Sequence, residues 1–205
     1  MDELIVVRHG ESAYSAVGRV NGDPSIEVDL TPRGRDEARR LGERLEAEPI
    51  ELCVTSGFLR ARRTADVAME GRDVPRLVRP ELNDIDVGDF EGGDIGSLRT
   101  WLRRAGPAAI PPGGREARSV CVHRYALALR WLLDRSERTI LAVSHGLFVT
   151  YAVRGAHGRS LPLTLEGTQA GHAQPHRLTA DQVRRAAGRL EAYAADPAGH
   201  GPPAT

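Results

Sequence analysis

The chain has 205 residues, enough for one domain with a sizeable core that needs neither a metal nor a disulfide to fold. Its 28 basic residues balance 28 acidic ones, so no net charge is present to recruit nucleic acid or an acidic membrane surface. Every basic residue is arginine, and this excludes a P-loop lysine and a Schiff-base lysine.

The two cysteines indicate the compartment. Cys53 lies in an apolar stretch and Cys121 in a helical pattern, as is typical of buried thiols in a reducing environment. No signal-peptide pattern fits the start of the chain, because the first apolar run reaches a charge at Arg8. No apolar run approaches the ~18 to 20 residues of a membrane span. We expect a cytoplasmic protein that binds neither membrane nor nucleic acid.

The first predicted element repeats later in the chain. Residues 4–7 are apolar and end at Arg8-His9-Gly10, and residues 140–143 are apolar and end at Ser144-His145-Gly146. Such runs are typical of parallel strands buried on both faces. The carboxyl ends of parallel strands line the ligand crevice, so adjacent strands would direct both imidazoles into one pocket. We therefore expect a chemical role for both histidines.

The next elements alternate between helix and strand. After a loop of residues 12–30, Thr31 and the proline behind it predict the start of a helix over residues 32–48. Residues 50–55 predict a second strand, and residues 56–69 a second helix. This order favours an α/β fold, a three-layer sandwich whose mostly parallel sheet has helices on both faces.

Residues 88–114 interrupt that alternation. They combine a glycine-rich turn, a short amphipathic segment and a run of prolines and glycines. A segment of this length inside a compact domain is usually functional, so we interpret it as a small cap on the substrate side.

The rest of the chain returns to regular elements. We predict a long helix over residues 116–134, the second histidine strand, one or two edge strands within residues 161–178, and a final helix over residues 181–194. The proline, glycine and alanine content of residues 196–205 predicts a disordered tail. A single domain would then span residues 1–195.

Four short motifs follow one another along the chain in an order that is typical of one protein family. They are Arg8-His9-Gly10-Glu11, Ser56-x-x-x-Arg60-Ala61-x-x-Thr64-Ala65, Leu82-Asn83-Asp84 ahead of Gly88-Asp89-Phe90-Glu91-Gly92, and Ser144-His145-Gly146. Together they resemble the histidine phosphatase family, which includes cofactor-dependent phosphoglycerate mutase, over roughly residues 4–155. The resemblance implies a phosphomonoesterase that needs no metal or cofactor and acts on a small phosphorylated metabolite.

The chemistry of phosphoryl transfer supports the same reading. A neutral imidazole can form a covalent intermediate with phosphorus near pH 7. The transferring group spreads charge over its oxygens, and guanidinium groups grip two oxygens at once. We therefore assign His9 as the nucleophile that forms phosphohistidine, and Arg8 and Arg60 as the phosphate clamp. His145 would be a third donor, expected to be charged.

The leaving alkoxide needs a proton from a nearby carboxylic acid. By resemblance, the proton donor is Asp84, where relatives usually carry Glu. Glu81 is the alternative, since in an extended chain only one of the two side chains can face the site. Ser15 stands where relatives often place an Asn that holds a phosphate oxygen, and its hydroxyl can also donate. Gly22 and Gly146 complete the expected substrate-binding residues.

Several alternatives remain open at this stage. A phosphoglycerate mutase would return the phosphoryl group to a retained substrate, and a non-catalytic module would only bind phosphorylated ligands. The substrate is also open. Pro175 between His172 and His176 argues against a metal site. Arginines near the cap could bind a second anionic group or form a solvated face, and these are Arg99, Arg103, Arg104, Arg115 and Arg118.

Overall fold

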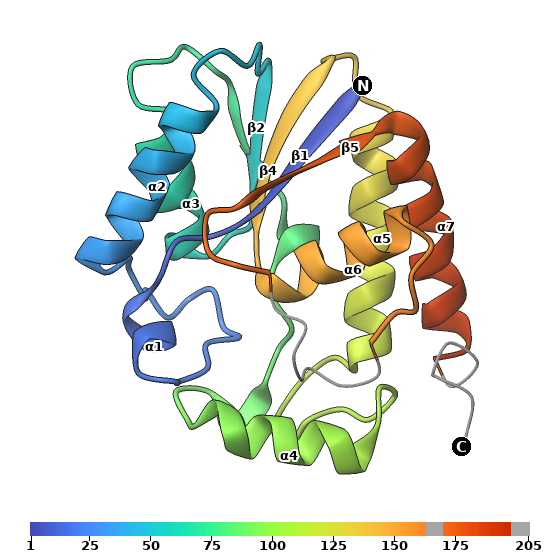
Figure 1. The fold of residues 1–205 in the computed structure, drawn as a ribbon. Helices are drawn as coiled ribbons and strands as arrows, with labels where there is room; N and C mark the ends of the chain where they lie inside the picture. Colours follow the sequence, from blue (N-terminus) through green and yellow to red (C-terminus); the bar gives the residue numbers. More distant parts are fainter. Residues whose placement is uncertain (163–169, 198–205) are drawn as a thin grey trace.

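A five-stranded sheet forms the middle of three layers in the computed structural model, which describes residues 1–162 and 170–197 (Figure 1). The strand order is β3-β2-β4-β1-β5. The strands are β1 (Glu3–Arg8), β2 (Leu52–Thr55), β3 (Arg76–Val78), β4 (Thr139–Ser144) and β5 (Pro175–Thr179). Only β5 runs antiparallel, on the edge beside β1. The predicted α/β class with a mostly parallel sheet is confirmed.

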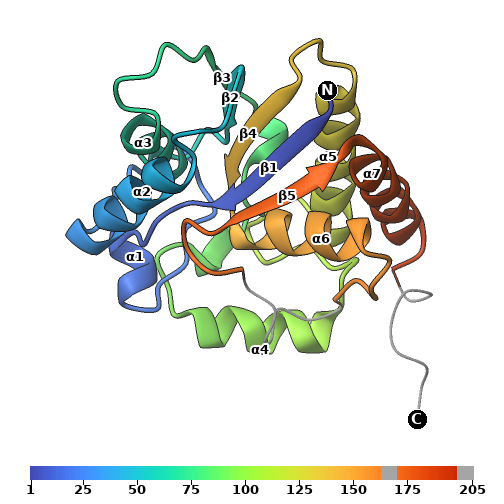
Figure 2. The same cartoon turned by 45° about the horizontal axis from the view of Figure 1, so that its top comes forward.

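Helices cover both faces of the sheet, as Figure 2 shows. The α-helices are α1 (Ala13–Ala16), α2 (Pro32–Arg44), α3 (Leu59–Ala68), α4 (Ile95–Ala105), α5 (Arg118–Leu133), α6 (Gly146–Ala156) and α7 (Ala180–Ala195). Helices α2 and α3 lie on one face, and α5, α6 and α7 on the other. No helix in the described part of the chain has both the length and the apolar character to cross a bilayer.

Alternate residues of β1 enter two separate apolar clusters. Leu4 and Val6 pack on the α5–α7 side, whereas Ile5 and Val7 pack on the α2–α3 side. None of these four side chains is exposed. Burial on both faces explains why β1 is an unbroken apolar run rather than an alternating one.

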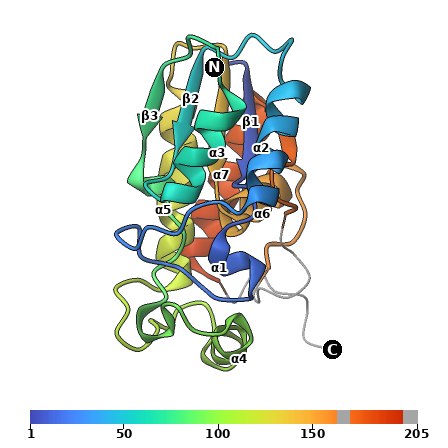
Figure 3. The ribbon, with the colours of Figure 1, turned by 90° about the vertical axis from the view of Figure 1, so that its left-hand side faces the viewer.

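The predicted cap lies at the carboxyl ends of the strands, apart from the sheet layers (Figure 3). It contains the short 3-10 helix η2 (Gly88–Phe90) and helix α4, whose Leu98 and Leu102 pack into the main core. The amide of Asp89 donates to the carbonyl oxygen of Pro112 at 2.7 Å and closes the base of the segment. The two ends of the cap are therefore joined to each other, and Leu98 and Leu102 attach its helix to the core.

The structure departs from the predicted elements at the end of α2, at α6 and at β3. The helix expected to reach residue 48 ends at Arg44, because the amide of Leu45 bonds to Gly42 in a tighter turn. Helix α6 was not predicted, since it is buried nearly all round and has no polar stripe. Strand β3 was missed because its three residues are exposed at the sheet edge.

The sequence analysis expected one or two edge strands within residues 161–178. Among the described residues of that stretch, the structure has one strand, β5. Part of that stretch, residues 163–169, lies outside the described residues. So do residues 198–205 of the predicted disordered tail.

The loop that follows β1 touches the start of α2 with no space for a side chain. A Cβ on Gly34 would overlap the carbonyl oxygen of Glu11, and a Cβ on Gly10 would overlap the carbonyl oxygen of Gly34. This backbone contact fixes the chain immediately after His9.

We predict that Gly34→Ala lowers the free energy of unfolding by about 1–3 kcal/mol, because the added methyl group must displace backbone. The matched control is Gly188→Ala in α7, where the nearest atom is an Arg130 guanidinium nitrogen at 3.9 Å. That change should raise stability by up to about 1 kcal/mol through helix propensity. Urea unfolding gives the free energy of unfolding of each variant. Equal effects of the two substitutions would contradict the close backbone contact at Gly34.

Candidate active site

Two histidines meet at the carboxyl ends of neighbouring strands. Strands β1 and β4 pair in parallel with Arg8 opposite Ser144, so the next residue on each strand is a histidine. The amide of His9 donates to the carbonyl oxygen of Ser144 at 2.9 Å. The ring centroids of His9 and His145 are 5.3 Å apart. The predicted convergence of the two imidazoles is confirmed.

The guanidinium of Arg60, from α3, lies between these rings. Its Nε donates to Nε2 of His9 and its Nη2 to Nδ1 of His145, both at 3.1 Å. Nη1 bonds to Oδ1 of Asn21, and Nη2 also donates to the Asn21 carbonyl oxygen at 3.1 Å. Burial lowers the pKa of Arg60 to about 10, so the group stays charged at neutral pH.

The contacts of Arg60 determine where each histidine carries its proton. A guanidinium only donates, so Nε2 of His9 and Nδ1 of His145 must both accept. The proton of His9 is then on Nδ1, which donates to the Gly10 carbonyl oxygen at 2.7 Å. The proton of His145 is on Nε2, which donates to Oγ of Ser56 at 2.8 Å.

Both imidazoles are neutral in this environment. Burial holds the pKa of each well below its ordinary value, and the positive charge of Arg60 lowers it further. The sequence analysis expected a charge on His145, and the burial of its ring beside an arginine is the reason that the structure favours the neutral form.

Asp84 brings a carboxyl group to the same cluster. Its Oδ2 lies 3.7 Å from Nη2 of Arg60 and 3.6 Å from Nδ1 of His145, and its Oδ1 accepts from the amide of Ile85 at 3.1 Å. Burial raises the pKa of Asp84, although the nearby arginine opposes that effect. The group therefore holds a proton at higher pH than an exposed aspartate.

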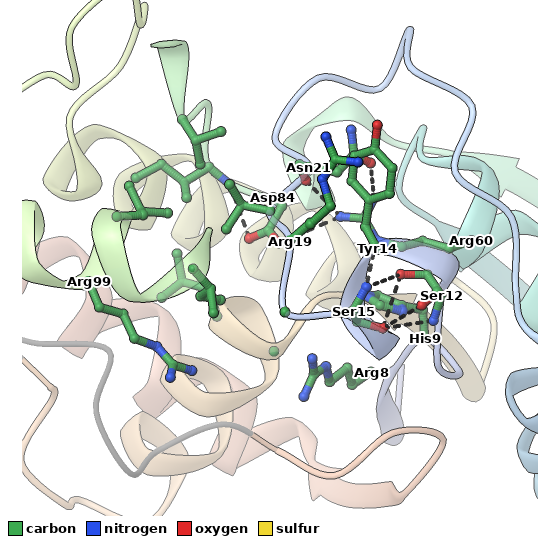
Figure 4. A pocket seen from close by; sticks show the side chains of 18 of the residues that line it. Arg8, His9, Ser12, Tyr14, Ser15, Arg19, Asn21, Arg60, Asp84 and Arg99 are labelled. Atoms are coloured by element: carbon green, nitrogen blue, oxygen red, sulfur yellow. Dashed lines mark hydrogen bonds and ion pairs between the residues drawn. The ribbon is translucent and has the colours of Figure 1, made fainter. Parts of the chain in front are cut away.

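Three other predicted site residues line the same cavity (Figure 4). Arg8 donates through Nη1 to the carbonyl oxygen of Ala170 at 2.9 Å. Gly146 begins α6. The hydroxyl of Ser15 accepts from the amide of Ser12 at 2.8 Å in a capping box at the start of α1, so it already has a backbone partner.

Two predicted substrate-binding residues do not line the cavity. Gly22 donates its amide to Oε2 of Glu91 at 2.6 Å. Glu81 pairs with Arg79 at 2.7 Å, from the short 3-10 helix η1 (Pro80–Leu82), and not from the extended chain considered above. Of the two candidate acids, only Asp84 is in contact with the histidine cluster.

One face of α3 and the turn before it supports the site at helical spacing. Thr64 accepts from the amide of Gly10 at 3.0 Å and donates to the carbonyl oxygen of Arg60 at 2.7 Å. Ser56 bonds His145, as described above. Arg60 and Thr64, four residues apart, share one face of α3, and Ser56 lies in the turn before the helix.

The sequence analysis missed a link between the cap and the arginine clamp. Glu91 accepts from Nδ2 of Asn21 at 3.0 Å and from the amide of Asp23 at 3.0 Å. Asn21 in turn holds Arg60. Glu91 belonged to a quoted motif, but no local signal in the sequence singled out Asn21.

The cavity has a volume of about 220 Å³ and two unlike ends. Arg8, His9, Arg60 and Asp84 lie at its polar end. Its other wall is apolar and consists of Val20, Ile85, Val87, Ile95, Leu98 and Leu147. Such a cavity suits a ligand with an anionic head and a less polar body.

The chain belongs to the histidine phosphatase superfamily. The model of that superfamily, branch 1, matches residues 4–193. Members of the superfamily are phosphatases or phosphotransferases.

Particular relatives include proteins of both kinds. The chain is 32% identical to a 2,3-bisphosphoglycerate-dependent phosphoglycerate mutase from Methylobacterium sp. (strain 4-46), over 80% of each chain. It is 39% identical to an adenosylcobalamin/α-ribazole phosphatase of Salmonella typhimurium, over 43% of each. Among solved structures, Bacillus stearothermophilus YhfR superposes with a TM-score of 0.73 at 28% identity, covering 85% of this chain and 89% of that one.

We predict that both site histidines are neutral at pH 6.5 and hold their protons on opposite nitrogens. Two-bond ¹⁵N–¹H correlation spectra should show the Nδ1–H tautomer for His9 and the Nε2–H tautomer for His145. Arg60→Gln should raise both pKa values, because it removes the neighbouring positive charge. A doubly protonated ring at pH 6.5 in the unaltered protein would contradict the arrangement.

Proposed function

We propose that this protein is a phosphatase that hydrolyses a small phosphomonoester metabolite through a phosphohistidine on His9. One observation carries the proposal. The unprotonated Nε2 of His9 faces a buried guanidinium in a cavity that a carboxyl group also reaches, Asp84. A nucleophile, a charge-stabilising donor and an acid therefore line the same cavity.

In the first step, the substrate phosphate takes the place of His9 as acceptor for Arg60, with Arg8 as the second cation. Nε2 of His9 forms the bond to phosphorus as the bond to the leaving oxygen breaks. Asp84 gives its proton to that oxygen, which leaves as an alcohol. The phosphate charge would also raise the pKa of His145, and so allow it to act as a third donor.

In the second step, water attacks the phosphohistidine. The Asp84 carboxylate left by the first step accepts the proton of that water, and the bond between phosphorus and Nε2 breaks. Inorganic phosphate leaves, and both His9 and Asp84 return to their starting protonation states. The scheme uses only side chains of this protein.

Hydrolysis is favoured over mutase chemistry by the size of the cap. A mutase must exclude water while its substrate is retained. Here the cap contains a single α-helix of 11 residues, α4. The binding-module alternative requires an acid that cannot deliver a proton, and the raised pKa of Asp84 argues against it. Relatives described as α-ribazole phosphatase and 2-carboxy-D-arabinitol-1-phosphatase also support hydrolysis.

A cytoplasmic location suits the two cysteines. Cys53 and Cys121 are both buried and unpaired, and burial raises the pKa of each thiol to about 12. Such thiols act as small apolar side chains.

The test of the reaction is phosphate release from p-nitrophenyl phosphate and from a panel of metabolite phosphomonoesters, with and without a chelator. We predict that His9→Ala abolishes release while the far-UV circular dichroism spectrum is unchanged. Rapid quenching without acid should trap labelled phosphate on His9 of the unaltered enzyme. A label on another residue, or full activity of the variant, would refute the mechanism.

We predict that Asp84→Asn lowers kcat/KM by about 10² to 10⁴-fold for alkyl phosphates, whose alkoxides need a proton. The loss should be far smaller for p-nitrophenyl phosphate, because its phenolate leaves unaided. For alkyl esters, kcat/KM of the unaltered enzyme should fall as pH rises through the raised pKa of Asp84, and the variant should lack that decline.

Glu81→Gln is the matched control, since Glu81 is paired with Arg79 outside the cavity. It should change neither the leaving-group dependence nor the pH profile. The reverse pattern, with Glu81→Gln deficient and Asp84→Asn active, would identify Glu81 as the proton donor.

A further inference from the structure

The apolar wall of the cavity consists of residues that take no part in the proposed phosphate chemistry. Its six residues come from the loop after α1, the stretch that leads into the cap, α4 and α6. Five of them are at most 8% exposed, so the wall is part of the packed core and not a loose rim. A leaving group with several hydroxyls would lose water there without gaining hydrogen bonds, whereas a hydrocarbon body would be stabilised.

One cation on this wall, Arg99, has no partner among the described residues. Arg99 extends from α4 into the cavity, beside Leu98 (Figure 4). It makes no hydrogen bond or ion pair with the residues that the structure describes, and its Nε is buried without an acceptor. A partly buried guanidinium in this state favours binding of an anion.

The other three arginines of the cavity, Arg8, Arg19 and Arg60, differ from Arg99. Arg19 already donates to the carbonyl oxygen of Gly92 and lies 4.7 Å from the ring centre of Tyr14. Arg8 belongs to the phosphate end. Burial lowers the pKa of Arg8, and the positive charge of Arg99 lowers it further, so the two cations repel each other across one cavity. An anion placed at Arg99 would relieve that repulsion.

We infer that the cavity selects phosphomonoesters whose leaving group has an apolar body and carries a carboxylate that pairs with Arg99. This inference rests on the proposed phosphatase activity and specifies its substrate class. A carboxylate suits the position better than a second phosphate does, because one guanidinium offers a two-pronged partner for a single negative charge. The phosphate end, by contrast, supplies two arginines and His9.

Three types of alkyl phosphate separate the features of this substrate class. Carboxybenzyl phosphate, as its 3- and 4-isomers, has both the apolar body and the carboxylate. Benzyl phosphate has only the apolar body, and 3-phosphoglycerate has a carboxylate without one. We expect kcat/KM to be highest for one of the carboxybenzyl isomers, at least about tenfold above benzyl phosphate, as for a charge-assisted bidentate pair.

The deciding measurement is the kcat/KM ratio of that isomer to benzyl phosphate in two variants. Arg99→Gln should lower the ratio about tenfold, the loss typical of a charged hydrogen-bonding partner. Arg104→Gln removes the same charge from an exposed position of α4 and should leave the ratio unchanged. Use of a ratio cancels any general effect of the substitution on phosphoryl transfer.

An Arg99→Gln ratio equal to that of the unaltered enzyme would overturn the inference, and so would a preference for 3-phosphoglycerate. If benzyl phosphate is still hydrolysed, either of these results leaves the proposed phosphatase function intact. If none of the esters releases phosphate, the proposed function fails instead. Calorimetric dissociation constants for the same esters and variants then test the Arg99 pairing on its own, with the same tenfold criterion.

Discussion

The position of Arg60 between two imidazoles is the interaction on which the rest of the site depends. Its guanidinium is 4% exposed and makes its hydrogen bonds to neutral acceptors, two ring nitrogens and Asn21. The nearest carboxylate oxygen, on Asp84, is 3.7 Å away. A buried cation without a close anionic partner is costly, so this arrangement is suited to bind an anion. The same contacts keep His9 neutral and therefore nucleophilic.

The surrounding fold holds that arginine from several directions. Parallel pairing of β1 and β4 sets the two histidines side by side, and Thr64 ties the loop after β1 to the helix that carries Arg60. Asn21 holds the outer side of the guanidinium and is itself held by Glu91 of the cap. The cap is therefore connected to Arg60 through hydrogen bonds. A movement of Glu91 would be transmitted through Asn21 to the arginine that is proposed to bind the phosphate.

Sequence patterns predicted the parts of this arrangement that leave a local signal. The two strands and their terminal histidines follow from unbroken apolar runs, and Arg60 follows from the motif that opens the second helix. Helix α6 left no such signal because it is buried nearly all round and has no polar stripe. Asn21 acquires its role only when a loop folds against the cap. The charge of His145 leaves no local signal because it depends on Arg60, which is 85 positions away in the chain.

The two ends of the cavity differ in the kind of structure that builds them. Most side chains at the phosphate end belong to helices and strands or lie next to them. Arg8 and His9 lie at the end of β1, and Arg60 lies in α3. Much of the apolar wall, with Arg99, comes instead from the loop after α1 and from the cap. Phosphoryl chemistry needs fixed geometry, which the sheet provides, whereas loops can change without disturbing that sheet. Relatives that share the strands and the histidines can therefore act on different phosphate esters, and under the proposed function the residues of this cap, rather than the superfamily, would determine which leaving group the site accepts.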